Sequence, residues 1–288
     1  MASRIFVKKI EDWREFHEIV AGSEYKHWAF RGQSKAEWPL YSSLSRYIKD
    51  YGIHPQAWAE QEMRIMRIFK RKAHLFLDHV PDETDAFQWL ALMQHHGAPT
   101  RLLDFTWSPF VAAFFALERA TKDAAVWALF IPAIHKASLR FNLGGKSVTP
   151  DELILRNPGA YENFYLGNEV PFVTAGEPFV MNKRLIAQSG TFIVPGVLDQ
   201  PVEKILSGYP EPGKTVAKFV LKTHSLRDDA MQALYTMNIT NATLFPDLDG
   251  LASSMGYELE YHWAYNPKTM EINPGYKGLW GWGVDESK

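Results

Sequence analysis

The pattern of apolar and polar positions predicts strands and helices over most of the chain. Five short apolar runs have the alternation or the residue types of β-strands, and they lie at residues 26–34, 100–105, 124–132, 190–196 and 215–222. In the first run, Trp28 and Phe30 alternate with Ala29 and Arg31 before Gly32. This alternation places Arg31 at the end of a strand.

Apolar residues at helical spacing predict helices at residues 55–80, 82–95, 109–120, 225–237 and 248–263. On the first of these helices, Arg64, Arg67, Arg71 and His74 line one face, which is either a solvated charged face or a surface that contacts phosphate. Residues 142–180 are rich in Gly, Pro and Asn and predict a loop with short elements. About six strands and four or five helices that do not strictly alternate favour a single α+β domain over a doubly wound α/β sheet.

One segment carries a polar step between two apolar elements. Residues 101–118, "RLLDFTWSPFVAAFFALE", pass from a predicted strand through Asp104 to Ser108 into a predicted helix. Ser108 is a suitable N-cap, because its hydroxyl can accept from a free backbone N–H, and Pro109 lacks the donor that the first helical position would leave unpaired. We therefore expect the helix to begin at Pro109 and the polar step to lie at a strand end.

Composition and charge limit the functional classes. The net charge of −2 gives no global field for a polyanion, so any nucleic-acid contact must come from a local patch. The absence of cysteine excludes disulfides, thiolate nucleophiles and Cys-ligated zinc, and fits a reducing compartment. The charged N-terminus lacks a signal-peptide core, and the longest apolar run, residues 124–134, is far below the ~20 residues of a membrane span. We expect a cytoplasmic protein without a membrane segment.

Aromatic residues make up 14% of the chain and include ten tryptophans. Most of them must lie in the core or on a partner surface, since a monomer seldom leaves so much aromatic area in water.

Several kinds of catalytic site find no support in the sequence. There is no Gly-x-Ser-x-Gly elbow of a serine hydrolase. His95 and His96 are adjacent on a helix, so they point ~100° apart and rarely share a metal. We expect no metal, and we assign the histidines to a helix end or to substrate contact through one of them.

A group of polar residues lies at predicted strand ends, where ligands often bind: Arg31, Arg101, Asp104, Thr106 and Gln188. Each alone is more often structural, because an arginine and an aspartate that flank a strand commonly form a buried ion pair.

Four segments resemble, in order, the signature blocks of the FRG domain family, which is named for its Phe-Arg-Gly motif. They are "WAFRGQ" (28–33), "QHHGAPTRLLDFTWSPFVAAFFAL" (94–117), "NKRLIAQSGTF" (182–192) and "ATLFPDLDGLA" (242–252). The resemblance spans about residues 26–251, and the Gln-His-x-Gly-x-Pro-Thr-Arg-Leu-Leu-Asp-x-Thr block is specific. It leaves residues 266–288 as a tail rich in aromatic residues and glycine.

Two of these blocks resemble ADP-ribosyltransferases, which implies a split sheet flanked by helices and NAD as co-substrate. In those enzymes an arginine on the first core strand binds the pyrophosphate, a role that Arg31 would take because a guanidinium contacts phosphate bidentately. A hydroxyl at a second strand end braces the ribose or the catalytic acid, which points to Thr106 or Ser108. An aromatic face stacks on the nicotinamide, and Trp107 or Tyr41 could supply it. The resemblance implies NAD contacts from Arg31, Tyr41, Arg101, Trp107, Ser108 and His95, and a catalytic set of Arg31, Thr106, Gln188 and Asp104.

The chain departs from the transferase pattern at Gln188. Transferases of this kind usually carry a glutamate on a late core strand, and its charge stabilises the oxocarbenium-like state of the ribose. Gln188 can hydrogen-bond a hydroxyl but carries no charge. Either Gln188 holds the substrate while Asp104, Asp247 or another acid supplies the charge, or the analogy differs in detail.

The resemblance implies a transferase that modifies a macromolecule. In size and motif the chain is similar to the toxin of a toxin–antitoxin–chaperone anti-phage system, so RNA or another nucleic acid is the expected acceptor, and antitoxin and chaperone proteins are possible partners. The helix face with Arg64, Arg67 and Arg71 would then contact phosphate, and the tail at residues 275–283 would be a docking surface. Three alternatives remain open: a non-catalytic nucleotide or nucleic-acid binding module, an NAD glycohydrolase, and a phosphodiesterase assisted by His95 or His96.

Overall fold

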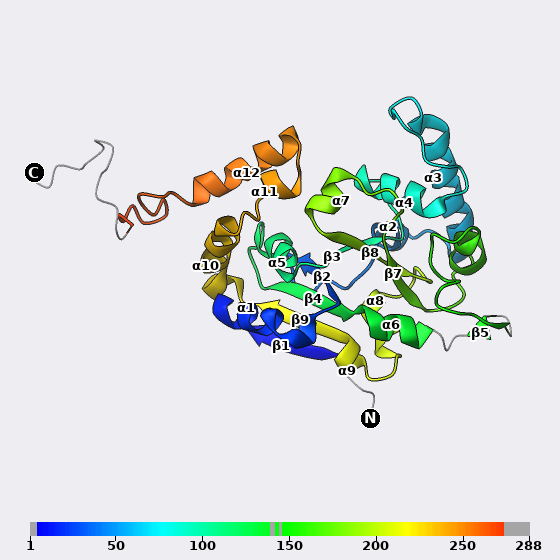
Figure 1. The fold of residues 1–288 in the computed structure, drawn as a ribbon, viewed down its shortest axis with the longest axis horizontal. Coiled ribbons are helices and arrows are strands. Elements are labelled where there is room, and N and C mark those ends of the chain that lie inside the picture. Colours follow the sequence, from blue (N-terminus) through cyan, green and yellow to red (C-terminus); the bar gives the residue numbers. More distant parts are fainter. Residues whose placement is uncertain (1–4, 139–141, 144–145, 274–288) are drawn as a thin grey trace, which may run out of the picture.

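A seven-stranded mixed sheet runs through the computed structural model (Figure 1). The structure describes residues 5–138, 142–143 and 146–273. The strands follow the order β1-β9-β4-β2-β3-β8-β7. Their bounds are Phe6–Ile10 (β1), Trp28–Gln33 (β2), Leu103–Thr106 (β3), Ala124–Phe130 (β4), Val173–Gly176 (β7), Gly190–Pro195 (β8) and Val216–Leu221 (β9). β1 pairs with β9 in parallel, and the other described pairs of this sheet are antiparallel. A separate pair, β5 (Asn142–Leu143) and β6 (Lys146–Ser147), is also antiparallel.

Helices cover both faces of the sheet (Figure 1). The longer ones are α1 (Trp13–Ala21), α2 (Ser43–Asp50), α3 (Trp58–Ala73), α4 (Ala86–His95), α5 (Pro109–Leu117), α6 (Ile131–Ser138), α10 (Thr223–Thr236) and α12 (Leu248–Glu260). The short ones are α7 (Lys183–Ala187), α8 (Val202–Ser207), α9 (Pro212–Thr215), α11 (Asn241–Leu244), the 3₁₀ turns η1 (Ser23–Tyr25) and η2 (Pro55–Ala57), and the π-helical turn η3 (Tyr161–Tyr165). These elements confirm the α+β fold class.

The α5 helix forms one side of the central core. Phe30 from β2 packs against it on one face of the sheet, whereas Ala29 points to the other face, where Leu103, Trp127 and Leu129 lie. Ser108 caps α5 as expected, since its hydroxyl accepts from the backbone N–H of Val111 at 3.3 Å.

Strands β2 and β3 diverge after a single paired position. β2 pairs with β4 over all six of its residues but with β3 only at Phe30 and Thr106. Beyond that point the Arg31 guanidinium, instead of a backbone N–H, donates to the carbonyl oxygen of Asp104 on β3 at 2.5 Å. The sheet therefore opens beside Arg31.

Other expectations differ from the structure. The helix expected at 55–80 is a shorter α3 that follows a 3₁₀ turn, and α6 begins within the apolar run expected to be only a strand. Residues 142–180 agree with the expectation of a loop with short elements, since they contain β5, β6, β7 and a π-helical turn. β1 was not predicted, because its sequence FVKKI is a polar edge strand with Phe6 and Val7 exposed, and pairing with β9 holds it.

Within the described residues, no helix is long and apolar enough to cross a membrane. The expected docking segment at 275–283 lies outside the described residues.

Candidate functional site

Arg31 is a half-buried side chain whose guanidinium forms no ion pair with a described carboxylate, although Asp104 lies nearby. Among the described residues, no carboxylate forms an ion pair with it, and its Nε is buried without a hydrogen-bond partner. Burial lowers the pKa of Arg31, the nearby Asp104 carboxylate opposes this shift, and Arg46 adds to it. An enclosed cation with unused donors is a favourable site for an anion.

The two residues after Arg31 are held by packing. A Cβ on Gly32 would lie 2.0 Å from the carbonyl oxygen of Ala112 in α5, so only glycine permits the close approach of this helix to β2. Gln33 accepts from the indole N–H of Trp127 at 2.8 Å and donates to the carbonyl of Pro39 at 3.3 Å. The Phe-Arg-Gly-Gln run thus positions the arginine rigidly.

Arg31 opens into a cavity of about 540 Å³, which we call the Arg31 pocket. Its lining residues come from β2, the loop after it, α2 and α5: Arg31, Gly32, Gln33, Ser34, Trp38, Pro39, Tyr41, Arg46, Lys49, Asp50 and Phe115. Three of them are cationic and one is acidic, so the pocket has a positive balance. The volume lies within the usual range for small-molecule sites.

Arg46 and Lys49 carry the second part of that positive charge. They lie three residues apart on α2 and are exposed. Arg46 donates to the backbone carbonyl of Tyr41 at 2.8 Å, and Lys49 donates to the Tyr41 hydroxyl at 2.6 Å. Neither forms an ion pair with a carboxylate of the described chain.

The sequence interpretation missed Arg46 and Lys49. The available signal was their i, i+3 spacing behind Ser42, whose hydroxyl caps α2 by accepting from the backbone N–H of Ser45 at 3.0 Å.

The Arg31 pocket also contains aromatic side chains that can pack against a ring. Tyr41, predicted as a nucleotide contact, lines the same cavity as Arg31. Trp38 is 45% exposed, and the Lys35 ammonium lies 5.0 Å from its ring centroid. Aromatic faces beside cations are the combination that a nucleotide requires, because the base or nicotinamide stacks while the phosphates pair with charge.

A chain of hydrogen bonds holds the Asp104 carboxylate next to Arg31. The backbone N–H of Leu102 donates to the Thr100 hydroxyl, and that hydroxyl donates to Gln94 Oε1 at 2.7 Å. Gln94 Nε2 then donates to Asp104 Oδ2 at 2.8 Å. Since the amide oxygen already accepts from Thr100, the amide nitrogen faces Asp104 and fixes the orientation of its carboxylate. This chain links Gln, Thr and Asp of the sequence block at residues 94–106.

Thr106, Ser108 and Gln188 meet at the end of β3, outside the residues that line the Arg31 pocket. The Thr106 hydroxyl donates to the Gln188 backbone carbonyl at 2.7 Å and accepts from the Ser108 N–H at 3.0 Å. Gln188 donates from Nε2 to the carbonyl of Leu244 in α11 at 3.1 Å. Trp107 is 41% exposed and donates to Glu177 Oε1 at 3.0 Å. These four residues, which we call the strand-end group, are therefore occupied by local contacts.

His95 lies half-buried at the end of α4, with its ring 4.8 Å from that of His96. Burial lowers the pKa of His95, the neighbouring His96 and Arg184 side chains act in the same direction, and Asp247 opposes them. His95 is absent from the lining of the Arg31 pocket.

Arg101 has a structural role in place of the expected nucleotide contact. It is completely buried, and its Nε and Nη2 donate to the two carboxylate oxygens of Glu62 in α3 at 2.7 and 2.5 Å. The guanidinium also lies 5.5 to 5.7 Å from the ring centroids of Tyr161 and Tyr165. Burial alone would lower the pKa of Arg101, but the Glu62 carboxylate raises it above its ordinary value. Arg101 therefore forms the buried ion pair that is common beside a strand, but its partner is Glu62 and not Asp104.

The arginine face expected on the long helix is present on α3. Arg64, Arg67 and Arg71 are exposed, and none of the described carboxylates pairs with them. The exposure of these arginines agrees with both interpretations, a face that contacts an anionic polymer and a charged face in solvent.

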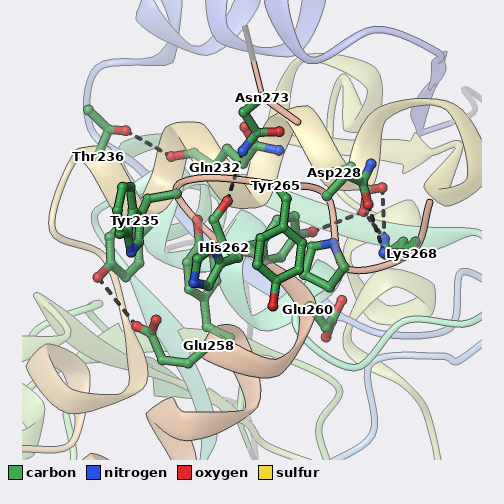
Figure 2. A pocket seen from close by; sticks show the side chains of 15 residues that line it. Asp228, Gln232, Tyr235, Thr236, Glu258, Glu260, His262, Tyr265, Lys268 and Asn273 are labelled. Carbon is green, nitrogen blue, oxygen red and sulfur yellow. Dashed lines mark hydrogen bonds and ion pairs between the residues drawn. The ribbon is translucent and has the colours of Figure 1, made fainter. Parts of the chain in front are cut away.

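Another cavity, of about 540 Å³, lies where α10, α12 and the following loop meet (Figure 2). Tyr235, Tyr257 and Tyr261 form a continuous stack with centroid separations of 4.2 and 4.5 Å. Glu258 and Glu260 also line it. The acidic side chains make this aromatic cluster unsuitable for holding RNA by its phosphates.

Within the described chain, no group of three His, Asp or Glu residues is placed to hold a metal ion. No curated protein and no solved structure matches the chain. The family model of the FRG domain matches residues 26–125, a segment that holds Arg31, Tyr41, Arg46, Lys49 and Asp104. Residues 26–125 of this chain are therefore similar to the FRG domain family, the family suggested by the Phe-Arg-Gly motif.

Proposed function

We propose that this protein is an NAD-dependent ADP-ribosyltransferase that modifies a macromolecule, with RNA as the acceptor. The observation that carries the proposal is Arg31, a half-buried arginine whose Nε is buried without a hydrogen-bond partner and whose guanidinium forms no ion pair in the described chain. It lines a pocket with two more cations and aromatic side chains. All of these cations lie in the segment that matches the FRG domain.

The cations of the Arg31 pocket suit the pyrophosphate of NAD. Arg31 can donate bidentately from a fixed position, because β2 and α5 hold its backbone. Arg46 and Lys49 approach from α2 and can neutralise the remaining negative charge. Tyr41 or Trp38 offers a face for one of the rings.

The proposed reaction breaks the bond between ribose C1′ and the nicotinamide nitrogen. Nicotinamide leaves with the bonding electron pair as a neutral molecule, and C1′ becomes oxocarbenium-like. A nucleophilic oxygen or nitrogen of the acceptor bonds to C1′ and loses its proton to a base or to water. Asp104 supplies the negative charge in this proposal, since Gln94 orients its carboxylate and Gln188 has only an amide. Thr106 and Gln188 hold the strand end that brings Asp104 and Arg31 together.

RNA is proposed as the acceptor because α3 presents Arg64, Arg67 and Arg71 as an exposed cationic face, while the aromatic cavity near α12 is acidic. Such an enzyme would act in the cytoplasm as an anti-phage toxin and would need an antitoxin, and a chaperone could accompany it.

A second candidate is a nucleotide-binding module without turnover. The specific observation in its favour is the strand-end group, where Gln188 stands in place of an acid and is occupied by the carbonyl of Leu244. Hydrolysis of NAD alone would use the same pocket with water as the nucleophile.

The test incubates the purified chain with NAD labelled in the adenylate phosphate, separately with RNA, DNA and cell extract. The double variant Arg46→Ala/Lys49→Ala removes two exposed cations without disturbing the core. Arg31→Lys keeps the positive charge but loses the planar guanidinium that can donate two parallel hydrogen bonds to a phosphate. Arg14→Ala, on the exposed face of α1, is the matched control. Melting temperatures verify that each variant is folded.

Label on RNA that is reduced at least about tenfold in both pocket variants, and retained in Arg14→Ala, supports the proposal. Saturable NAD binding without release of nicotinamide supports the module, and free nicotinamide without labelled polymer supports hydrolysis. A wild-type protein that neither binds nor consumes NAD contradicts all three.

A further inference from the structure

Helix α12 has its apolar stripe on the side that faces away from the protein. Leu248, Leu251, Met255 and Leu259 are exposed by 77%, 51%, 50% and 81%. Their spacing of three, four and four residues places them on one side of a helix. A helix on a protein surface ordinarily turns such a stripe toward the core.

The opposite side of α12 is held against the protein by different residues. Gly250 is the buried residue of this helix, and a Cβ there would lie 1.9 Å from the carbonyl oxygen of Phe245. Tyr257 is stacked between Tyr235 and Tyr261, and the Tyr261 hydroxyl donates to Asp228 at 2.9 Å. Rotating the helix to bury its leucines would break these contacts.

The stripe is therefore a fixed feature of the folded chain. In Figure 1, α12 extends from the sheet as an arm beyond α10 and α11. A helix of 13 residues is marginal in water by itself, so α12 depends on the contacts that Gly250 and Tyr257 make with the rest of the chain. These contacts leave the apolar stripe exposed, and its burial by another molecule would stabilise the helix further.

The acidic residues around the stripe favour a positively charged binding partner. From residue 228 to residue 267 the chain has six acidic residues and neither lysine nor arginine, but Asp228 pairs with Lys268 and Glu260 pairs with Arg227. Four acidic residues of this segment form no ion pair with a described residue. Asp249 and Glu258 lie near the two ends of the exposed stripe, one on each side of it, and neither forms an ion pair with a described residue. Nucleic acid and an anionic membrane surface are both repelled by this charge.

We propose that the exposed stripe of α12 is the docking site for a basic amphipathic helix of a partner protein. The partner's apolar face covers the four side chains of the stripe, and its lysine or arginine flanks pair with Asp249 and Glu258. Pairing of α12 with α12 of a second copy does not fit, because the two helices in either orientation bring acidic ends together.

The docking site is connected to the strand-end group through α11. The Gln188 side chain donates to the carbonyl of Leu244 at the end of α11, and α12 begins four residues later with Asp247 as its cap. A partner on α12 therefore binds close to the elements that hold the strand end, whether or not the Arg31 pocket turns over NAD.

The experiment titrates the full-length chain into a fluorescently labelled 18-residue peptide and follows anisotropy. The peptide carries leucines at the spacing of a helical stripe and lysines on both flanks, and a twin peptide has glutamate in place of every lysine. The test variant is Leu251→Ser/Leu259→Ser. The control is Ser253→Ala, which is exposed on the same helix but away from the stripe. Sedimentation velocity of the free protein over a hundredfold concentration range measures whether the chain forms dimers.

We expect saturable binding of the lysine peptide, at least about tenfold weaker in the double variant and unchanged in Ser253→Ala, with slower amide exchange along α12 in the complex. The glutamate twin should not bind. Equal binding of both peptides, no binding of the lysine peptide, or equal affinity in the double variant overturns the proposal. Dimerisation that disappears in the double variant overturns it in favour of a second copy.

Discussion

The ion pair between Arg101 and Glu62 provides the sharpest test of what the Thr-Arg-Leu-Leu-Asp block does. Both side chains are buried, with 0% and 2% of their surface exposed, and two charged hydrogen bonds join them. Glu62→Ala removes the carboxylate and leaves a guanidinium in the core. The remaining polar contact of that guanidinium is the carbonyl of Pro195 at 3.2 Å.

Breaking a buried pair in this way costs about 3 to 5 kcal/mol, because the charge left behind is not compensated. A domain of this size loses about 2 to 4 °C of melting temperature per kcal/mol. Glu62→Ala should therefore melt about 6 to 20 °C below wild type. Replacing both charges with apolar residues, as in Glu62→Leu/Arg101→Met, should recover most of this loss, since no buried charge remains.

Urea denaturation followed by tryptophan fluorescence measures these differences, and Arg64→Ala on the exposed side of the same helix should lie within about 0.5 kcal/mol of wild type. A normal midpoint for Glu62→Ala would refute the structural role. So would an Arg101→Met protein that keeps its stability but loses NAD binding, because Arg101 would then be a ligand residue.

Three further expectations follow from particular contacts. Gly32→Ala should destabilise by about 3 kcal/mol or more, measured as a loss in denaturation midpoint, because the new Cβ meets the backbone of α5 at Ala112, and an unchanged midpoint would contradict this packing. Gln94→Glu should slow the proposed transfer at least about tenfold, because it replaces the amide that donates to Asp104 with a second carboxylate that repels it, and an unchanged rate of transfer would separate Asp104 from the chemistry. Burial lowers the pKa of His135 below its ordinary value of 6.5, so the unfolded chain takes up a proton that the folded chain does not, and stability should fall as the pH drops below about 6.5. The dependence should be weaker in His135→Gln, and an equal slope in that variant would assign the effect elsewhere.

Local signals in the sequence were enough for β2 and α5 but not for α2, which also lines the Arg31 pocket and was not predicted. Ser108 and Pro109 predicted the start of α5, and the alternation through Trp28 and Phe30 predicted β2 with Arg31 at its end. These signals work because capping and strand alternation depend on residues within a few positions of one another. The α+β class followed from the order of such elements.

Contacts between distant residues could not be inferred in that way. Arg101 and Asp104 flank one strand and suggested an ion pair, yet the partner is Glu62, 39 residues away on a helix that appeared from its sequence to be only charged and amphipathic. Arg46 and Lys49 joined the Arg31 pocket only when the fold brought α2 beside β2. Periodicity predicts which face of a helix is apolar, but not which element it will meet.

The sequence by itself therefore determined the types of the main elements, the cap of α5 and the position of Arg31 at a strand end. The tertiary structure decided that β2 and β3 diverge, so that Arg31 reaches into a cationic pocket, and that Arg101 belongs to the core. It also decided that α12 is held by Gly250 and Tyr257, which leaves its leucines outside. The physical reason is that backbone preference is local, whereas the burial and pairing of a charge or an apolar stripe depend on what the rest of the chain places against it.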